Sequence, residues 1–365
     1  MIPSWLAANP RVQRKQTFGV AQRAVIDPAA VPDVGALLGD KHGPTPLYSL
    51  PALAERLGVG ELRVKDESQR FGFGAFKALG GVFAVHEFIA THKGRAPGEI
   101  VFTTASSGNH GRSVALGAQS VGARCVIFLP KFTSAEKEAA IRTRGAEVIR
   151  VDGDYDAAVA ECRRQAAAKG WTIISDTSWE GYEAIPLSVM RGYTVLAEEI
   201  VRQWADKPTH VFVQAGVGGL AAAVIGYLWA VLPERPTSIV VEPASADCWL
   251  QSNAAGRPAL ASGNADTAMG GLACREISPV TWPVIGLGAD WFMTIDEDQV
   301  MPARRLFAHP LGDDPAIVSG PSGCAGLAGL TRVCADEAAF KALGLGKKAR
   351  VLLINSEGNL GESPT

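Results

Sequence analysis

The sequence shows no excess of charge of either sign and no cysteine framework. Its 35 basic and 37 acidic residues give a formal net charge of −2, so its electrostatics favour neither nucleic acid nor an anionic membrane surface as a partner. The six cysteines include no C-x-x-C pair, which argues against a zinc knuckle and against a disulfide framework. We expect reduced, mostly buried thiols.

The sequence also lacks a long apolar run and a leader segment. Its longest apolar stretch, residues 218–232, is shorter than a membrane span. The N-terminus "MIPSWLAANPRVQRKQTF" lacks the apolar core of a signal peptide. With 47% hydrophobic and 20% charged residues, the composition is that of an ordinary globular protein, and 365 residues exceed what one hydrophobic core usually supports. We expect a cytoplasmic protein of two domains.

Apolar strands alternate with helical patterns along most of the chain. The predicted strands are 100–105, 124–130, 146–151, 171–176, 209–216, 237–243 and, ending in a turn, 349–359. Helical periodicity follows many of them, at 111–122, 134–145, 155–170 and 220–231. This alternation indicates parallel sheets that are covered on both faces. The predicted fold class is α/β, with two sheets.

Three predicted strand-to-helix turns carry glycine or small polar residues, at 103–113, 214–221 and 354–359. Ligands of α/β proteins bind beyond the carboxyl ends of strands. Gly216, Gly218 and Gly219 would let backbone N–H groups approach a phosphate, although tight packing also requires glycine at such turns. A dinucleotide site is an alternative, with Glu242 on the ribose, but the G-x-G-G spacing differs from that fingerprint and Lys77 stays unexplained.

Lys77 lies in "RFGFGAFKALGG", at the start of a predicted helix. The helix dipole and the apolar neighbours would disfavour the charged amine and lower its pKa. A neutral amine can form a Schiff base with an aldehyde, whereas the commoner alternative is a surface lysine whose stem lies along apolar groups. A lysine, a phosphate cradle and polar turns together fit pyridoxal phosphate.

Several motifs resemble one enzyme family. "SSGNHG", "AGVGG" and "NSEGN" resemble the tryptophan-synthase-β-like, or fold-type II, pyridoxal-phosphate enzymes, which include threonine dehydratase and serine racemase. "KDESQRFGFGAFKALGG", "SDTSWEGYEAIP", "MRGY", "VEPASADC" and "MGGLAC" look like the diaminopropionate ammonia-lyases, from about Thr45 to Glu357. The resemblance implies a homodimer with two parallel-sheet α/β domains in each chain. We place a small domain at 97–181, inserted between two parts of a large domain, 1–96 and 182–365.

The resemblance also implies roles for individual residues. Lys77 stands where the family has its Schiff-base lysine, and Asn109 where an amide binds the hydroxyl of the cofactor ring. Ser356 matches the hydroxyl residue at the pyridine nitrogen, which it would leave unprotonated, and Asp176 matches an active-site aspartate that could assist a leaving amine. The phosphate loop matches Gly216, Val217, Gly218, Gly219 and Leu220.

Two positions depart from the ammonia-lyase pattern. Ser107 stands where those enzymes have an aspartate before "GNHG", and serine is the pattern of dehydratases and racemases. Cys248 replaces a carboxylate of the racemases' metal loop, so we expect no metal site there. His110 is interpreted as part of the turn that orients Asn109.

The resemblance predicts a lyase that eliminates a β-substituent from a small amino acid. The predicted reaction converts 2,3-diaminopropionate, with the L-isomer preferred, to pyruvate and ammonia. A dehydratase or racemase of hydroxy amino acids with the same fold is the alternative. A nicotinamide-dependent dehydrogenase and a non-catalytic ligand-binding protein stay open as further interpretations.

Overall fold

The computed structural model describes residues 1–39 and 43–359, so the last residues of the predicted segment 182–365 lie outside the described part. The chain forms two compact units. We call them the seven-strand unit (Met1–Ala30, Pro44–Phe76 and Leu196–Thr365) and the four-strand unit (Val31–Gly43 and Lys77–Val195). The domain boundaries predicted at 97 and 181 stay a prediction.

The sheet of the four-strand unit is entirely parallel, in the order β6-β5-β4-β7. Its strands are β4 (Val101–Ala105), β5 (Arg124–Pro130), β6 (Glu147–Val151) and β7 (Thr172–Ile173). These match four predicted strands, but 171–176 forms only a two-residue strand. The chain leaves the sheet there because the Tyr182 hydroxyl donates to the carbonyl of Ile173 and accepts from the backbone N–H of Ser175.

Two helices of this unit pack closely against each other. They are α4 (Lys77–Thr91) and α5 (Asn109–Val121). A Cβ atom added at Gly81 would lie 2.1 Å from Ser113 Oγ, so only glycine permits this approach. Ser113 Oγ also donates to the backbone carbonyl of Lys77 at 2.6 Å. The contact thereby fixes the first residue of α4. The other helices of this unit, as far as it is described, are α2 (Val34–Leu37), α6 (Ala135–Arg142), α7 (Tyr155–Lys169) and the first part of α8 (Ala184–Gln203).

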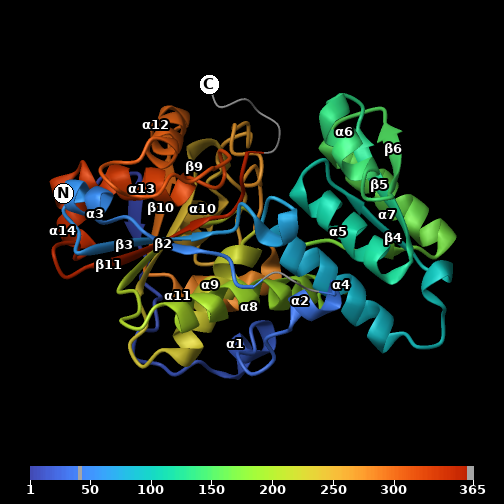
Figure 1. Ribbon diagram of the computed structural model, residues 1–365, viewed down its shortest axis with the longest axis horizontal. Coiled ribbons are helices and arrows are strands. Elements are labelled where there is room, and N and C mark those ends of the chain that lie inside the picture. Colours follow the sequence, from blue (N-terminus) through green and yellow to red (C-terminus); the bar gives the residue numbers. More distant parts are fainter. Residues whose placement is uncertain (40–42, 360–365) are drawn as a thin grey trace. The chain divides into compact units, whose positions relative to one another are not determined.

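The seven-strand unit has a mixed sheet, in the order β1-β10-β9-β8-β11-β3-β2 (Figure 1). Its five inner strands are mutually parallel and the two edge strands are antiparallel to their neighbours. Its strands are β1 (Leu6–Ala8), β2 (Leu47–Ser49), β3 (Glu61–Asp66), β8 (His210–Gln214), β9 (Thr237–Pro243), β10 (Trp291–Ile295) and β11 (Arg350–Asn355). Its helices include α1 (Val20–Val25), α3 (Pro51–Leu57), α9 (Gly219–Val231), α10 (Cys248–Ala255), α11 (Trp282–Gly288), α12 (Glu297–Ala308), α13 (Ala325–Cys334) and α14 (Glu337–Ala342).

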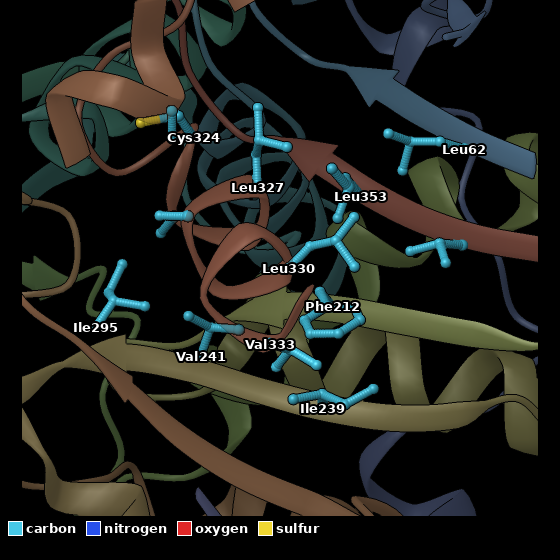
Figure 2. Packing of buried hydrophobic residues seen from close by; sticks show 14 of the residues in the cluster. Leu62, Phe212, Ile239, Val241, Ile295, Cys324, Leu327, Leu330, Val333 and Leu353 are labelled. Carbon is cyan, nitrogen blue, oxygen red and sulfur yellow. The ribbon is translucent and has the colours of Figure 1, made fainter. Parts of the chain in front are cut away.

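One hydrophobic core of this unit lies between α13 and the sheet, as Figure 2 shows. Leu327, Leu330 and Val333 recur at helical spacing on α13, so they share one face. They pack against strand residues such as Phe212 and Leu353, and all five are at most 1% exposed. Burial of this face holds α13 against β8 and β11.

The cysteines are free thiols, as predicted: four are buried, and Cys274 and Cys334 are partly exposed. Across residues 1–39 and 43–359, no helix combines the length and the apolar character that crossing a bilayer requires.

Candidate active site

Lys77 and Asp176 form an ion pair in the four-strand unit. Lys77 Nζ donates to Asp176 Oδ2 at 2.5 Å, and the two side chains are 18% and 21% exposed. Lys77 is the first residue of α4, and Asp176 lies three residues beyond β7. The amine therefore has a carboxylate partner that its apolar sequence context did not predict.

The surroundings of this ion pair affect its protonation. Burial favours the neutral form of Asp176, but the charge of Lys77 and the hydrogen bond from Lys77 outweigh burial, so the pKa of the carboxyl is lowered. The ring of Tyr193 lies 5.8 Å from Lys77 Nζ, and burial raises the pKa of its hydroxyl. Asp176 is thus an anion at neutral pH, next to a neutral phenol.

His110 lies beside the same carboxylate. Its Nδ1 is 3.9 Å from Asp176 Oδ2, and its Nε2 lies 2.9 Å from the carbonyl of Ile174, to which it donates. Burial lowers the pKa of His110, so the imidazole is neutral at neutral pH. The sequence assigned His110 only to a turn. His110 follows β4 and Asp176 follows β7, and these two strands are neighbours in the sheet. The positions of both residues after neighbouring strands could have predicted that they lie close together.

Ser107 and Asn109 lie in the turn between β4 and α5 and are partly exposed. Asn109 is the first residue of α5, and its Oδ1 accepts from Arg112 Nη1 at 3.2 Å. The turn places both residues next to His110 in the chain.

The predicted phosphate loop, residues 216–220, connects β8 to α9 in the seven-strand unit. Gly218 has φ +104°, and a Cβ atom there would lie 2.3 Å from Trp249 Cζ2 and 2.9 Å from Thr281 Oγ1. Only glycine fits this conformation and this space. Trp249 Nε1 also donates to the carbonyl of Gly216 at 2.8 Å. The loop is a shaped turn at the N-terminus of a 13-residue helix, where a phosphate is favoured.

Ser356 follows β11 and is 4% exposed. Its Oγ accepts from Gln214 Nε2 at 3.0 Å, and Gln214 ends the neighbouring strand β8. The backbone N–H of Phe76 donates to the carbonyl of Ser356 at 3.1 Å. Ser356 is therefore held by two segments that are distant from it in the sequence.

These residues fit pyridoxal phosphate better than a dinucleotide. A partly exposed amine, a glycine turn at a helix N-terminus and a small hydroxyl at a strand end are the groups that the cofactor needs. Glu242, the alternative ribose ligand, is 1% exposed and accepts from the backbone N–H groups of Trp249 and Leu250 at 2.9 and 2.6 Å. Its carboxyl group is engaged within the protein.

Comparisons with known proteins agree with this fit. Residues 38–357 match the family described as "Pyridoxal-phosphate dependent enzyme". The chain is 40% identical over 338 residues to diaminopropionate ammonia-lyase of Escherichia coli K12, covering 87% of this chain and 85% of that protein.

Solved structures of the E. coli enzyme share the fold. Its complex with an aminoacrylate–pyridoxal phosphate azomethine intermediate has a TM-score of 0.88 and 36% identity, and its complex with D-serine has 0.85 and 35%. Each covers 98% of this chain and 94% of that one. The predicted α/β class, the tryptophan-synthase-β-like fold and the cofactor are confirmed. The chain belongs to the diaminopropionate ammonia-lyases, within the pyridoxal-phosphate-dependent enzymes.

Proposed function

We propose that the protein eliminates ammonia from 2,3-diaminopropionate, that water hydrolyses the resulting aminoacrylate to pyruvate and a second ammonia, and that the L-isomer is preferred. The observation that carries this proposal is the pair of Lys77 and Asp176, an amine and a carboxylate 2.5 Å apart in a chain of this family. The pair offers one group for the Cα proton and another for a charged leaving group. We also propose a cytoplasmic homodimer.

The family resemblance assigns each cofactor contact to a residue of this chain. Lys77 would bind the aldehyde carbon and Asn109 the ring hydroxyl. Backbone N–H groups of residues 216–220 would bind the phosphate, and the Ser356 hydroxyl the pyridine nitrogen. When bound, pyridoxal phosphate withdraws electrons from the substrate's Cα and makes its hydrogen acidic.

Lys77 and Asp176 would divide the proton transfers. Lys77 Nζ would take the Cα proton of an L-amino acid. In this structure the Lys77 ammonium lowers the pKa of Asp176. When Lys77 is engaged in the reaction, the β-ammonium group of the substrate would replace it as the cationic partner, and the carboxylate would hold that group in the protonated form that leaves. A hydroxyl leaving group carries no positive charge and would gain less from this carboxylate. This difference supports diaminopropionate over serine or threonine.

Ser107 would determine the stereochemical preference. A serine hydroxyl is a much weaker base than the aspartate that the ammonia-lyase pattern has at this position, so the Cα face opposite Lys77 would lack an effective base. L-diaminopropionate should therefore react much faster than the D-isomer. The related E. coli enzyme has been solved with D-serine, and that complex does not determine the preference of this chain.

The test is release of ammonia and pyruvate from both isomers. Asp176→Asn should slow turnover of L-diaminopropionate more than it weakens cofactor retention, which absorbance measures separately. Ser107→Asp should raise activity on the D-isomer. Equal wild-type rates on D and L, or an Asp176→Asn enzyme as fast as wild type, would contradict these roles.

The alternatives give different results in the same assay. Faster release from serine or threonine would identify a dehydratase, and interconversion of isomers without release a racemase. Binding without any turnover would indicate a ligand-binding protein.

A further inference from the structure

Gln214 is the last residue of β8, two residues before the phosphate loop begins at Gly216, and it is 1% exposed. Its Nε2 lies near three backbone carbonyl oxygens, at 2.9 Å from Ile354, 3.0 Å from Ser322 and 3.4 Å from Gly323. Carbonyl oxygens can only accept hydrogen bonds. The NH₂ end of the amide must therefore face them, because the amide oxygen in its place would lie against three other acceptors. The carbonyl oxygens thus distinguish the nitrogen end of the Gln214 amide from its oxygen end.

The fourth acceptor on Nε2 is Ser356 Oγ, at 3.0 Å. An NH₂ group has no lone pair to offer, so the serine hydroxyl cannot donate to it and must accept. The hydrogen of the Ser356 hydroxyl is consequently directed away from Gln214 and is available for another acceptor. Accepting a hydrogen bond also polarises a hydroxyl and makes it a better donor.

The other end of the Gln214 side chain shows that this arrangement has an energetic cost. Gln214 Oε1 is buried and has no hydrogen-bond partner within residues 1–39 and 43–359. A buried acceptor without a partner destabilises the folded protein, and an apolar side chain of the same size would avoid that cost. The donors on Nε2 are thus the chemical reason for an amide at this position.

We infer that Gln214 is a positioning residue that fixes Ser356 as a hydrogen-bond donor toward the pyridine nitrogen of pyridoxal phosphate. The inference rests on the role proposed above for Ser356. A nitrogen that accepts a hydrogen bond from a neutral hydroxyl stays unprotonated. Gln214 would thereby set the electronic state of the ring, although it does not touch the cofactor.

The experiment uses the full-length protein loaded with pyridoxal phosphate that is labelled with ¹⁵N in the ring. The chemical shift of that nitrogen reports directly on its protonation and on hydrogen bonds to it. In the wild-type protein the signal should be that of an unprotonated nitrogen with a hydrogen-bond donor. Gln214→Met and Ser356→Ala should both move the signal downfield, toward that of a nitrogen without a donor. Cofactor affinity should fall between about twofold and about tenfold in each.

Two comparisons distinguish this role from general loosening of the fold. Adding Gln214→Met to Ser356→Ala should shift the nitrogen signal no further, because Gln214 acts through that hydroxyl. Gln203→Met changes another glutamine of the same unit, in contact with Thr45 and Lys65, and should leave the signal unchanged. If Gln214→Met does not fold, Gln214→Leu serves instead: it also removes the donor to Ser356 and should also move the signal downfield.

A wild-type nitrogen that is protonated would overturn the inference. So would a shift in Ser356→Ala that neither Gln214 variant reproduces, or no shift in Ser356→Ala itself. Ammonia release from diaminopropionate tests the proposed reaction separately, because a correct reaction with an unshifted nitrogen would refute only the role of Gln214.

Discussion

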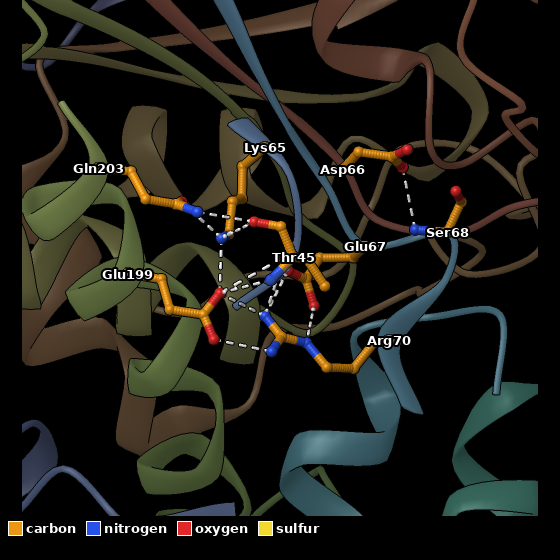
Figure 3. Close-up of polar contacts among 8 residues, drawn as sticks. All are labelled: Thr45, Lys65, Asp66, Glu67, Ser68, Arg70, Glu199 and Gln203. Carbon is orange, nitrogen blue, oxygen red and sulfur yellow. Dashed lines mark hydrogen bonds and ion pairs between the residues drawn. The ribbon is translucent and has the colours of Figure 1, made fainter. Parts of the chain in front are cut away.

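Replacing Glu67 with glutamine should destabilise the protein strongly, because it removes a carboxylate that neutralises Arg70 inside the seven-strand unit. Figure 3 shows the cluster, in which Arg70 lies between Glu67 and Glu199. Arg70 Nε and Nη2 donate to the two oxygens of Glu67 at 2.8 and 2.7 Å, and these side chains are 2% and 0% exposed. Lys65 Nζ forms a second ion pair with Glu199 at 2.5 Å.

The size of the effect follows from the charges of this cluster. Two cations, Lys65 and Arg70, are balanced by two carboxylates, so Glu67→Gln leaves one positive charge buried without a counterion. Breaking a buried ion pair in this way costs about 3–5 kcal/mol. Adding Arg70→Met removes the uncompensated charge, so the double variant should be less destabilised than the sum of the two single variants.

The measurement is the free energy of unfolding in urea, which does not screen ion pairs. The control is Glu147→Gln, which breaks the ion pair between Glu147 and Arg124, two side chains that are 58% and 57% exposed. That substitution should change stability by no more than about 0.5 kcal/mol. If Glu67→Gln is no more destabilising than Glu147→Gln, the buried charges do not contribute as argued.

Three further results are expected. Burial opposes ionisation of Glu199, but Arg70 and Lys65 outweigh burial and lower the pKa of Glu199. The ionised Glu199 therefore stabilises the folded protein above its ordinary pKa of 4.5, and this stabilisation is lost as the pH falls below that value. Glu199→Gln should make the free energy of unfolding less dependent on pH in this acidic range. Burial raises the pKa of Glu242 well above 4.5, so the folded protein binds a proton that the unfolded chain releases, and this stabilisation decreases as the pH rises. Glu242→Gln should remove that decrease from the free energy of unfolding, measured from about pH 5 to about pH 8. Gly218→Ala should abolish retention of pyridoxal phosphate, measured by absorbance after gel filtration, whereas retention as in wild type would mean that the loop accommodates a side chain at φ +104°.

The sequence predicted several buried strands that are continuous apolar runs. It missed β10, whose sequence is WFMTI, and it missed strands with polar residues. The predicted strands 124–130 and 237–243 coincide with β5 and β9, because each is apolar along most of its length. In contrast, β3 has the sequence ELRVKD and was not predicted. Its Lys65 is fully buried because the charged cluster satisfies it. A pattern based on hydrophobicity cannot detect a strand whose burial depends on partners far away in the chain.

The same limit applies to the candidate site. The turns at 103–113 and 214–221 were predictable because glycine and small polar residues at strand ends are local signals. The contact between Lys77 and Asp176 joins residues that are 99 positions apart, in segments that β4–β7 pairing and α4–α5 packing help to bring together. The resemblance therefore predicted both residues as members of the site, and that assignment stays a prediction, whereas the ion pair that lowers the pKa of Asp176 was not predicted.

The direction of a hydrogen bond is less predictable still. Ser356 was recognised as a small hydroxyl residue, but whether it donates or accepts depends on which end of the Gln214 amide it meets. That end is determined by carbonyl oxygens of Ser322, Gly323 and Ile354, which lie 108 to 140 residues after Gln214. In the sequence, Gln214 is simply a polar residue at the end of an apolar strand. A donor and an acceptor at the pyridine nitrogen would favour opposite protonation states. If Gln214 has the role proposed above, the chemistry of the cofactor would depend on a residue that no local pattern identifies.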